Sequence, residues 1–279
     1  MLERPRTAIA AALACLAGLI VTGVLAELVP AAHVRDSASL RGFASLRDTR
    51  LSQVLERIAH LADGAPYTLV GMAIVITALV RSRRRLALVV SGVLVAAPAT
   101  TEVLKQLLAT PRSTNVIDAY NIASASWPSG HATAAMTLAL CGVLVVPARM
   151  RPLAAIAGGL FTVAVSYAVL VWVWHFPSDV IGGLFVAGTY GALAVATLRR
   201  WPDPYHLGEP RPRERIVLWP AVALGVGAGV VGLALAVRRH ESILARVDGQ
   251  PSFVLAAAAI AALAVGLAAL LAVTLRSGS

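Results

Sequence analysis

Two histidines and one aspartate in this sequence have the types and spacing that nucleophilic chemistry requires. His175 and Asp179 stand four positions apart, with a Pro-Ser pair between them. A carboxylate that is hydrogen-bonded to one imidazole nitrogen fixes the tautomer and leaves the other nitrogen as a nucleophile. Because histidine titrates near neutrality, His131 in a separate segment is suited to protonate a leaving alkoxide as a general acid. The three residues therefore predict catalysis through a histidine nucleophile.

Four other polar residues predict a binding site for a phosphate group. Lys105 is the single lysine among the 24 basic residues, and Arg112 follows seven positions later. Two such cations can hold a dianionic phosphate. Ser129 and Gly130 directly precede His131, and a hydroxyl and a glycine amide at a helix start both donate to anions. We expect this chemistry to need neither a metal ion nor another cofactor.

Each of these residues also has a purely structural interpretation. A histidine or an aspartate at a helix end can satisfy the helix terminus, a lysine can extend to the membrane surface, and an arginine can lie among lipid head groups. Ser129 can act as a helix cap, as a phosphate donor or as both. Glu102, three residues before Lys105, is expected to pair with that lysine and to take no catalytic step.

The composition places these residues in a membrane protein. Hydrophobic residues make up 58% of the 279 residues and charged residues only 14%, whereas about a quarter of a soluble domain is charged. Soluble globular, disordered and coiled-coil proteins are therefore excluded. We expect an all-α, polytopic membrane helix bundle. The apolar runs that approach spanning length are 8–31, 66–80, 86–109, 131–147, 153–174, 178–198, 216–237 and 253–275.

Arginine placement predicts the orientation of these runs. If the amino terminus is cytoplasmic, 14 of the 23 arginines fall on the cytoplasmic side, as the positive-inside rule requires. Both termini are then cytoplasmic, and the polar clusters reach the extracytoplasmic face of what we expect to be the plasma (inner) membrane. The surplus of positive charge thus reflects cytoplasmic loops and not nucleic-acid binding. The first run is interpreted as an uncleaved anchor, although its basic start also fits a secretory signal.

The segment 32–64 is too polar to span a membrane, and its apolar residues recur every three to five positions among arginines. This pattern predicts one or two amphipathic helices in the outer interface, which either form a lipid entrance or only stabilise the fold. Trp172, Trp174 and Phe176 flank His175 and likewise fit an aromatic belt or the lining of that entrance. No role is assigned to the remaining histidines, which are His33, His60, His206 and His240.

The sixth apolar run has a face of small residues. Gly183, Ala187 and Gly191 stand four positions apart along it. Such faces permit close helix packing, within one chain or between two copies. We expect packing within the chain.

The polar clusters resemble the motifs of the type-two phosphatidic acid phosphatase family, a lipid-phosphatase family that shares its site with acid phosphatases and vanadium haloperoxidases. The family motifs are written KxxxxxxRP, PSGH and SRxxxxxHxxxD. Lys105 to Arg112 match the first, Pro128 to His131 the second, and His175 with Asp179 the third. The shared order and spacing argue against a chance match. The resemblance covers residues 1–200 as a six-span core and leaves 201–279 as a cytoplasmic linker with a two-span extension.

This resemblance implies a lipid phosphate phosphatase whose partners are its lipid substrate and the membrane lipids. In this interpretation His175 attacks phosphorus, Asp179 orients it, and His131 protonates the departing lipid oxygen and later activates water. Plausible substrates are polyprenyl phosphates or diphosphates, phosphatidic acid and phosphatidylglycerol phosphate. The residues implied to hold the phosphoryl oxygens are Lys105, Arg112, Ser129 and Gly130.

Three positions depart from the family pattern, and one of them is Ala168, which stands where the third motif has a serine. Val169 stands where the third motif has an arginine, and Ser113 follows Arg112 where a proline is usual. The missing arginine removes a bidentate phosphate donor. Two alternatives to hydrolysis stay open: transfer of the phosphoryl group to an alcohol, and a non-catalytic lipid-binding or transport protein.

Overall fold

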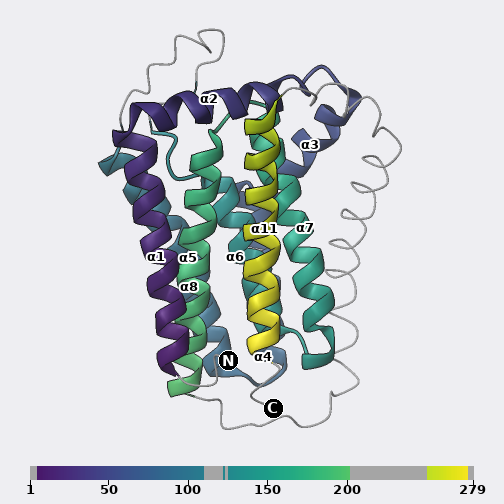
Figure 1. Cartoon of the computed structure of the whole chain (residues 1–279). Helices are drawn as coiled ribbons and strands as arrows, with labels where there is room; N and C mark the ends of the chain where they lie inside the picture. Colours follow the sequence, from purple (N-terminus) through teal and green to yellow (C-terminus); the bar gives the residue numbers. More distant parts are fainter. Residues whose placement is uncertain (1–4, 110–121, 123–124, 202–249, 276–279) are drawn as a thin grey trace.

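The computed structural model describes residues 5–109, 122, 125–201 and 250–275 (Figure 1). These residues form α-helices and one short 3-10 helix, and this part of the chain contains no strand. The predicted all-α membrane bundle is therefore confirmed. The helices are α1 Pro5–Leu28, α2 Pro30–Ala44, α3 Arg50–His60, α4 Gly64–Val80, α5 Arg84–Leu107, α6 Gly130–Val145, η1 Ala148–Met150, α7 Arg151–Val171, α8 Pro177–Arg200 and α11 Pro251–Thr274.

Five of the described helices, α1, α5, α7, α8 and α11, are long and apolar enough to cross a membrane. A sixth span results if α3 and α4, which meet at an angle of 58°, are counted together. Helix α6 is also apolar but has only 16 residues. Seven of the eight predicted runs thus coincide with a helix. The run 216–237 lies outside the described residues.

Proline marks the beginning of five described helices, and α1 begins with Pro5. Proline also occupies one of the first two positions of α2, α7, α8 and α11. At these positions the missing N–H has no helical partner to lose, and the fixed φ of proline matches that of a helix. Pro177 therefore sets the start of α8 two residues after His175.

Helix α8 approaches α6 closely because small residues face the contact. A Cβ atom at Gly183 would lie 2.5 Å from the carbonyl oxygen of Ser129, and one at Gly191 would lie 2.7 Å from Cδ1 of Leu140. A side chain at Gly183 would push the two helices apart, and one at Gly191 would require the side chain of Leu140 to shift. The face of small residues is thus used within the chain, as predicted.

Helix α2 lies across one end of the bundle, and α3 slopes down from that end beside α7 (Figure 1). Asp36 of α2 accepts hydrogen bonds from the backbone N–H (3.1 Å) and the hydroxyl (2.6 Å) of Ser178 in the first turn of α8. Ser39 of α2 donates to the carbonyl oxygen of Ser252 in α11 at 3.0 Å. The segment 32–64 is thus largely helical, and α2 is anchored to the start of α8. Its place as an amphipathic segment in the outer interface stays a prediction.

Helix α11 packs against α7, α2, α8 and α6. The ring centroids of Phe253 and Phe43 are 4.6 Å apart, and the hydroxyl of Tyr167 in α7 donates to the carbonyl oxygen of Ala257 at 2.7 Å. Helix α11 is therefore part of the same bundle as the helices before residue 201. The division into a core of residues 1–200 and an extension of 201–279 stays a prediction.

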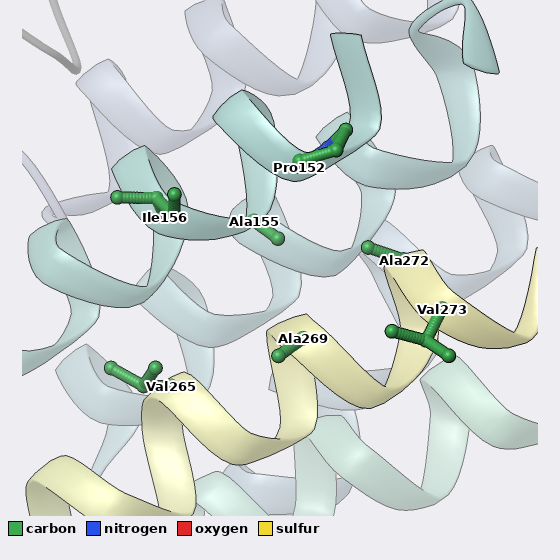
Figure 2. Close-up of a pocket in the computed structure, with 7 residues that line it drawn as sticks. All are labelled: Pro152, Ala155, Ile156, Val265, Ala269, Ala272 and Val273. Carbon is green, nitrogen blue, oxygen red and sulfur yellow. The ribbon is translucent and has the colours of Figure 1, made fainter. Parts of the chain in front are cut away.

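Figure 2 shows a groove of about 220 Å³ between α7 and α11, near the end of the bundle opposite α2. Every side chain that lines it is apolar, so the groove offers nothing that would bind a phosphate. The lining residues are Pro152, Ala155, Ile156, Val265, Ala269, Ala272 and Val273.

Candidate active site

The predicted catalytic residues meet at the end of the bundle that α2 covers (Figure 1). His131 lies in the first turn of α6, His175 in the link between α7 and α8, and Asp179 in the first turn of α8. The ring centroids of the two histidines are 6.3 Å apart. Lys105 lies in the last turn of α5. Segments that are far apart in sequence therefore deliver these four side chains to one region.

His175 and Asp179 form a buried pair. The distance from Nδ1 of His175 to Oδ2 of Asp179 is 3.4 Å; Asp179 has no exposed surface and His175 is 8% exposed. The same Oδ2 accepts the backbone N–H of Phe176 at 2.9 Å, which holds the carboxylate at the start of α8. Nδ1 of His175 makes no hydrogen bond within the described residues. The predicted hydrogen bond is thus a longer contact, at ion-pair distance.

His131 has a partner that lies outside all three motifs. Its Nε2 is 3.0 Å from Oδ1 of Asp63. The other carboxylate oxygen of Asp63, Oδ2, is 2.8 Å from Nδ1 of His60. The ring of Trp174 lies near both histidines, with centroid distances of 5.5 Å to His131 and 5.7 Å to His60. One carboxylate therefore links two imidazoles beside His175.

Asp63 lies at the corner between α3 and α4, where the chain bends by 58°. It precedes the first residue of α4, but its side chain makes no hydrogen bond that caps this helix. Burial by itself raises the pKa of the Asp63 carboxyl. Hydrogen bonds from His60 and His131 and the charge of their rings outweigh that effect and lower the pKa. The carboxyl group of Asp63 is therefore ionised where it contacts the two histidine rings.

Lys105 lies over the start of α6. Its Nζ is 2.8 Å from Oε1 of Glu102, which confirms the expected pair. A Cβ atom at Gly130 would lie 3.2 Å from the same Nζ. The absence of a side chain at Gly130 leaves room for the ammonium group next to the first turn of α6, where backbone N–H groups favour an anion.

Ser129 ties the start of α6 to the start of α8. Its backbone N–H donates to the carbonyl oxygen of Asp179 at 2.8 Å, and its hydroxyl oxygen accepts the N–H of Ala132 at 3.4 Å. The side chain is fully buried. The interpretation of Ser129 as a helix cap is confirmed, and its role as a phosphate donor stays a prediction.

Position 169, where the family pattern has an arginine, belongs to the apolar core. Val169 is fully buried in the main hydrophobic cluster, and its carbonyl oxygen accepts the N–H of Trp174 at 2.8 Å. Arg112 and Ser113 lie outside the described residues. Across the described ranges, no group of three or more His, Cys, Asp or Glu side chains is arranged to hold a metal ion.

The family comparison matches residues 86–203 to the model of the PAP2 superfamily. We call residues 86–203, which this model matches, the PAP2 segment. The resemblance inferred from the three motifs is confirmed, and the PAP2 segment contains all seven predicted site residues. No curated protein sequence matches the chain significantly.

The chain shares its fold with a solved structure. The chain is similar to a transmembrane PAP2-type phosphatidylglycerolphosphate phosphatase from Bacillus subtilis, with a TM-score of 0.60 and 18% sequence identity. The match covers 70% of this chain and 99% of that one. At this identity the likeness shows the fold alone. Together with the long apolar helices, it identifies an integral membrane protein.

Sequence analysis missed two residues beside the PAP2 motifs. His60 received no role and Asp63 was not considered, yet both connect to His131. Asp63 carries a usable signal, because an acidic residue directly before an apolar run lies at the membrane boundary, where ionisable groups are costly. His60 carries no comparable signal, since nothing in the sequence shows that α3 folds back toward α6.

Proposed function

We propose that this protein is an integral-membrane lipid phosphate phosphatase that acts at the extracytoplasmic face through a phosphohistidine intermediate. The observation that supports it most strongly is the meeting of His131, His175 and Asp179 in a PAP2 segment, with the two histidine rings 6.3 Å apart. A phosphoryl group between two such rings can be attacked by one imidazole while the other protonates the leaving oxygen.

In the first step, Nε2 of His175 forms a bond to phosphorus and the bond from phosphorus to the lipid oxygen breaks. Asp179, 3.4 Å from Nδ1, keeps the proton on that nitrogen and stabilises the positive charge that develops on the ring. His131 gives its proton to the departing lipid oxygen. In the second step water attacks the phosphohistidine, His131 takes a proton from the water, and inorganic phosphate is released.

In this proposal the phosphoryl oxygens are held by donors around the start of α6. Lys105 and the backbone N–H of Gly130 lie close together there, and Ser129 and Arg112 complete the set. Preorganised donors of this kind stabilise the charge of the transition state. The substrates proposed are phosphatidic acid, phosphatidylglycerol phosphate and polyprenyl phosphates or diphosphates.

The distribution of arginines supports the proposed orientation. Arg84 at the start of α5, Arg149 before α7, and Arg199 and Arg200 at the end of α8 all lie at the end of the bundle opposite His131 and His175. Positively charged residues near the ends of spans favour the cytoplasmic side. The end with the two histidines is then extracytoplasmic.

Phosphate release from each of these lipids by the purified protein tests the proposal. We expect wild type to release phosphate from at least one lipid and His175→Ala to release about 10³-fold less or lower still, because it lacks the nucleophile. His33→Ala is the matched control, since the ring of His33 contacts the backbone carbonyl of Ala26. Equal release by wild type and His175→Ala would refute the mechanism. A product that forms only with an added alcohol would instead indicate a phosphotransferase.

Burial of Val169 favours a second candidate, a lipid-binding or transport protein without turnover. An apolar residue replaces the arginine of the family pattern and is packed into the core. If wild type is inactive with every lipid and Val169→Arg creates hydrolysis, this second candidate is correct. If wild type is active, the remaining donors suffice and the candidate is excluded.

A further inference from the structure

Asp63 and His60 reach the proposed site from the corner between α3 and α4, which lies outside the PAP2 segment. The carboxylate of Asp63 is in contact with two imidazoles, through Oδ1 to His131 and Oδ2 to His60. Each carboxylate oxygen of Asp63 therefore contacts a different histidine. This arrangement fixes the orientation of the carboxylate toward His131.

The contact with Asp63 determines which nitrogen of His131 can exchange a proton with the substrate. A carboxylate accepts from an N–H, so the proton on Nε2 of His131 stays in the bond to Oδ1 of Asp63. The proton that moves to the leaving oxygen is then the one on Nδ1. Nδ1 becomes free to take a proton from water in the second step. Asp63 itself gains and loses no proton in this cycle.

The charges around His131 make this carboxylate important. Burial opposes a positive charge on His131 most strongly, and the charges of His175, from the link before α8, and of Lys105, from α5, oppose it further. Glu102 and Asp179 lie against Lys105 and His175, respectively. His60, on the far oxygen of Asp63, is a further group that can become positive. Asp63 is thus the carboxylate in direct contact with His131 when its ring is protonated.

We propose, on the basis of the phosphatase function above, that Asp63 is the positioning residue and counterion of His131, which it holds with Nδ1 toward the substrate. His60 holds the second oxygen of Asp63 and so connects the interfacial helix α3 to the catalytic histidine. The pairing stabilises the imidazolium form of His131, which is the form that donates the proton.

The pH dependence of turnover in Asp63→Asn tests this proposal, because asparagine keeps the shape and removes the charge. We expect kcat near neutral pH to fall about tenfold or more, within the range of a general-acid contribution, with little change in KM. The fall of kcat on the basic side must also begin at a lower pH, because His131 loses its proton more readily. Asp63→Glu restores part of the wild-type profile. Asp48→Asn, an exposed aspartate at the same end, leaves both quantities unchanged.

Two outcomes of this experiment overturn the proposal. One is an unchanged kcat in Asp63→Asn; the other is a lower kcat with an unchanged pH profile, which a merely structural role would give. A second measurement is independent of turnover: NMR titration of ¹⁵N-labelled histidine in the detergent-solubilised chain, with the His131 signal assigned through His131→Gln. The signal should titrate at a lower pH in Asp63→Asn than in wild type. An identical titration refutes the pairing, whereas an inactive wild type refutes only the phosphatase function.

Discussion

The two ends of the helix bundle use their charged side chains in different ways. At the end that α2 covers, Glu102, Asp63 and Asp179 each lie against a lysine or histidine of the proposed site. At the opposite end, arginines donate to backbone carbonyl oxygens where α6 and α11 finish. These bonds run from Arg81 to Val145 at 2.6 Å, from Arg151 to Leu275 at 2.7 Å and from Arg199 to Thr274 at 3.1 Å.

This difference separates charges that serve chemistry from charges that serve the fold. The last carbonyl groups of a helix have no intrahelical partner, so a cation there satisfies them and interacts favourably with the helix dipole. A lysine or histidine that is paired with a side-chain carboxylate can exchange that partner for a phosphate. We therefore expect substitutions of these paired site residues at the α2 end to change activity, and substitutions of the carbonyl-bound arginines at the opposite end to change stability.

Replacing Lys105 gives the largest difference between the two ends. Lys105→Met should lower kcat/KM by about 10²-fold, the loss measured when one transition-state donor is removed, without lowering the temperature of thermal unfolding. Arg84→Met, at an exposed cation of the opposite end, should leave kcat/KM unchanged. Equal losses in the two variants would remove the distinction between the ends.

Replacing Gly183 should affect both stability and activity, because this residue sets the distance between α8 and α6. A Cβ atom there would lie 2.5 Å from the carbonyl oxygen of Ser129, so Gly183→Ala should destabilise the fold by about 1–3 kcal/mol and displace the first turn of α6 with His131. Gly142→Ala is the matched control in α6, where a Cβ meets nothing within 4 Å. The temperature of thermal unfolding and the rate of phosphate release should both fall in Gly183→Ala and stay unchanged in Gly142→Ala.

Replacing Arg151 should affect stability alone. Arg151→Met keeps the apolar part of the side chain and removes a charged hydrogen bond to the end of α11, which costs about 2 kcal/mol. Arg149→Met, at an exposed arginine of the same link, serves as the control. A drop in the activity of the folded Arg151→Met protein would contradict the assignment of this end to the fold.

The smallest effect is expected for the contribution of Asp63 to stability, which is lost at acid pH. Its pKa is lowered in the folded protein from an ordinary 3.8, so its contribution is complete above that value and is lost as the pH falls through the lower folded pKa. The side chain is 44% exposed, and screening limits the effect to a few tenths of a kcal/mol. As the pH is lowered from about 5 to about 3, the temperature of thermal unfolding should therefore drop slightly more in wild type than in Asp63→Asn. Parallel curves would show that the two histidine contacts add no stability.

The sequence was sufficient to predict the helices and the motif residues for a simple physical reason. Apolar runs of spanning length must form helices in a membrane, and the motif residues sit at the ends of those runs, so alternation of the spans brings His131 and Asp179 to one face. Helix positions in the described part of the chain follow the apolar runs closely.

Contacts between distant segments could not be predicted in this way. Asp63 and His131 are 68 positions apart, and their contact depends on the bend between α3 and α4, which hydropathy does not encode. The packing of α11 against α7 likewise depends on the shapes of two apolar faces. The motifs therefore predicted the two histidines of the site, whereas only the fold shows that Asp63 is the partner of His131.

Detection of a phosphoryl group on His175 tests the central claim most directly. Wild type and His175→Ala are mixed with the lipid that gives the fastest phosphate release, stopped at alkaline pH and digested, and the peptide that contains residue 175 is analysed by mass spectrometry. The account predicts a phosphate on His175 that is lost in acid, and none on this peptide in His175→Ala. Turnover by wild type without any phosphate on His175, with hydrolysis retained in His175→Ala, would contradict it.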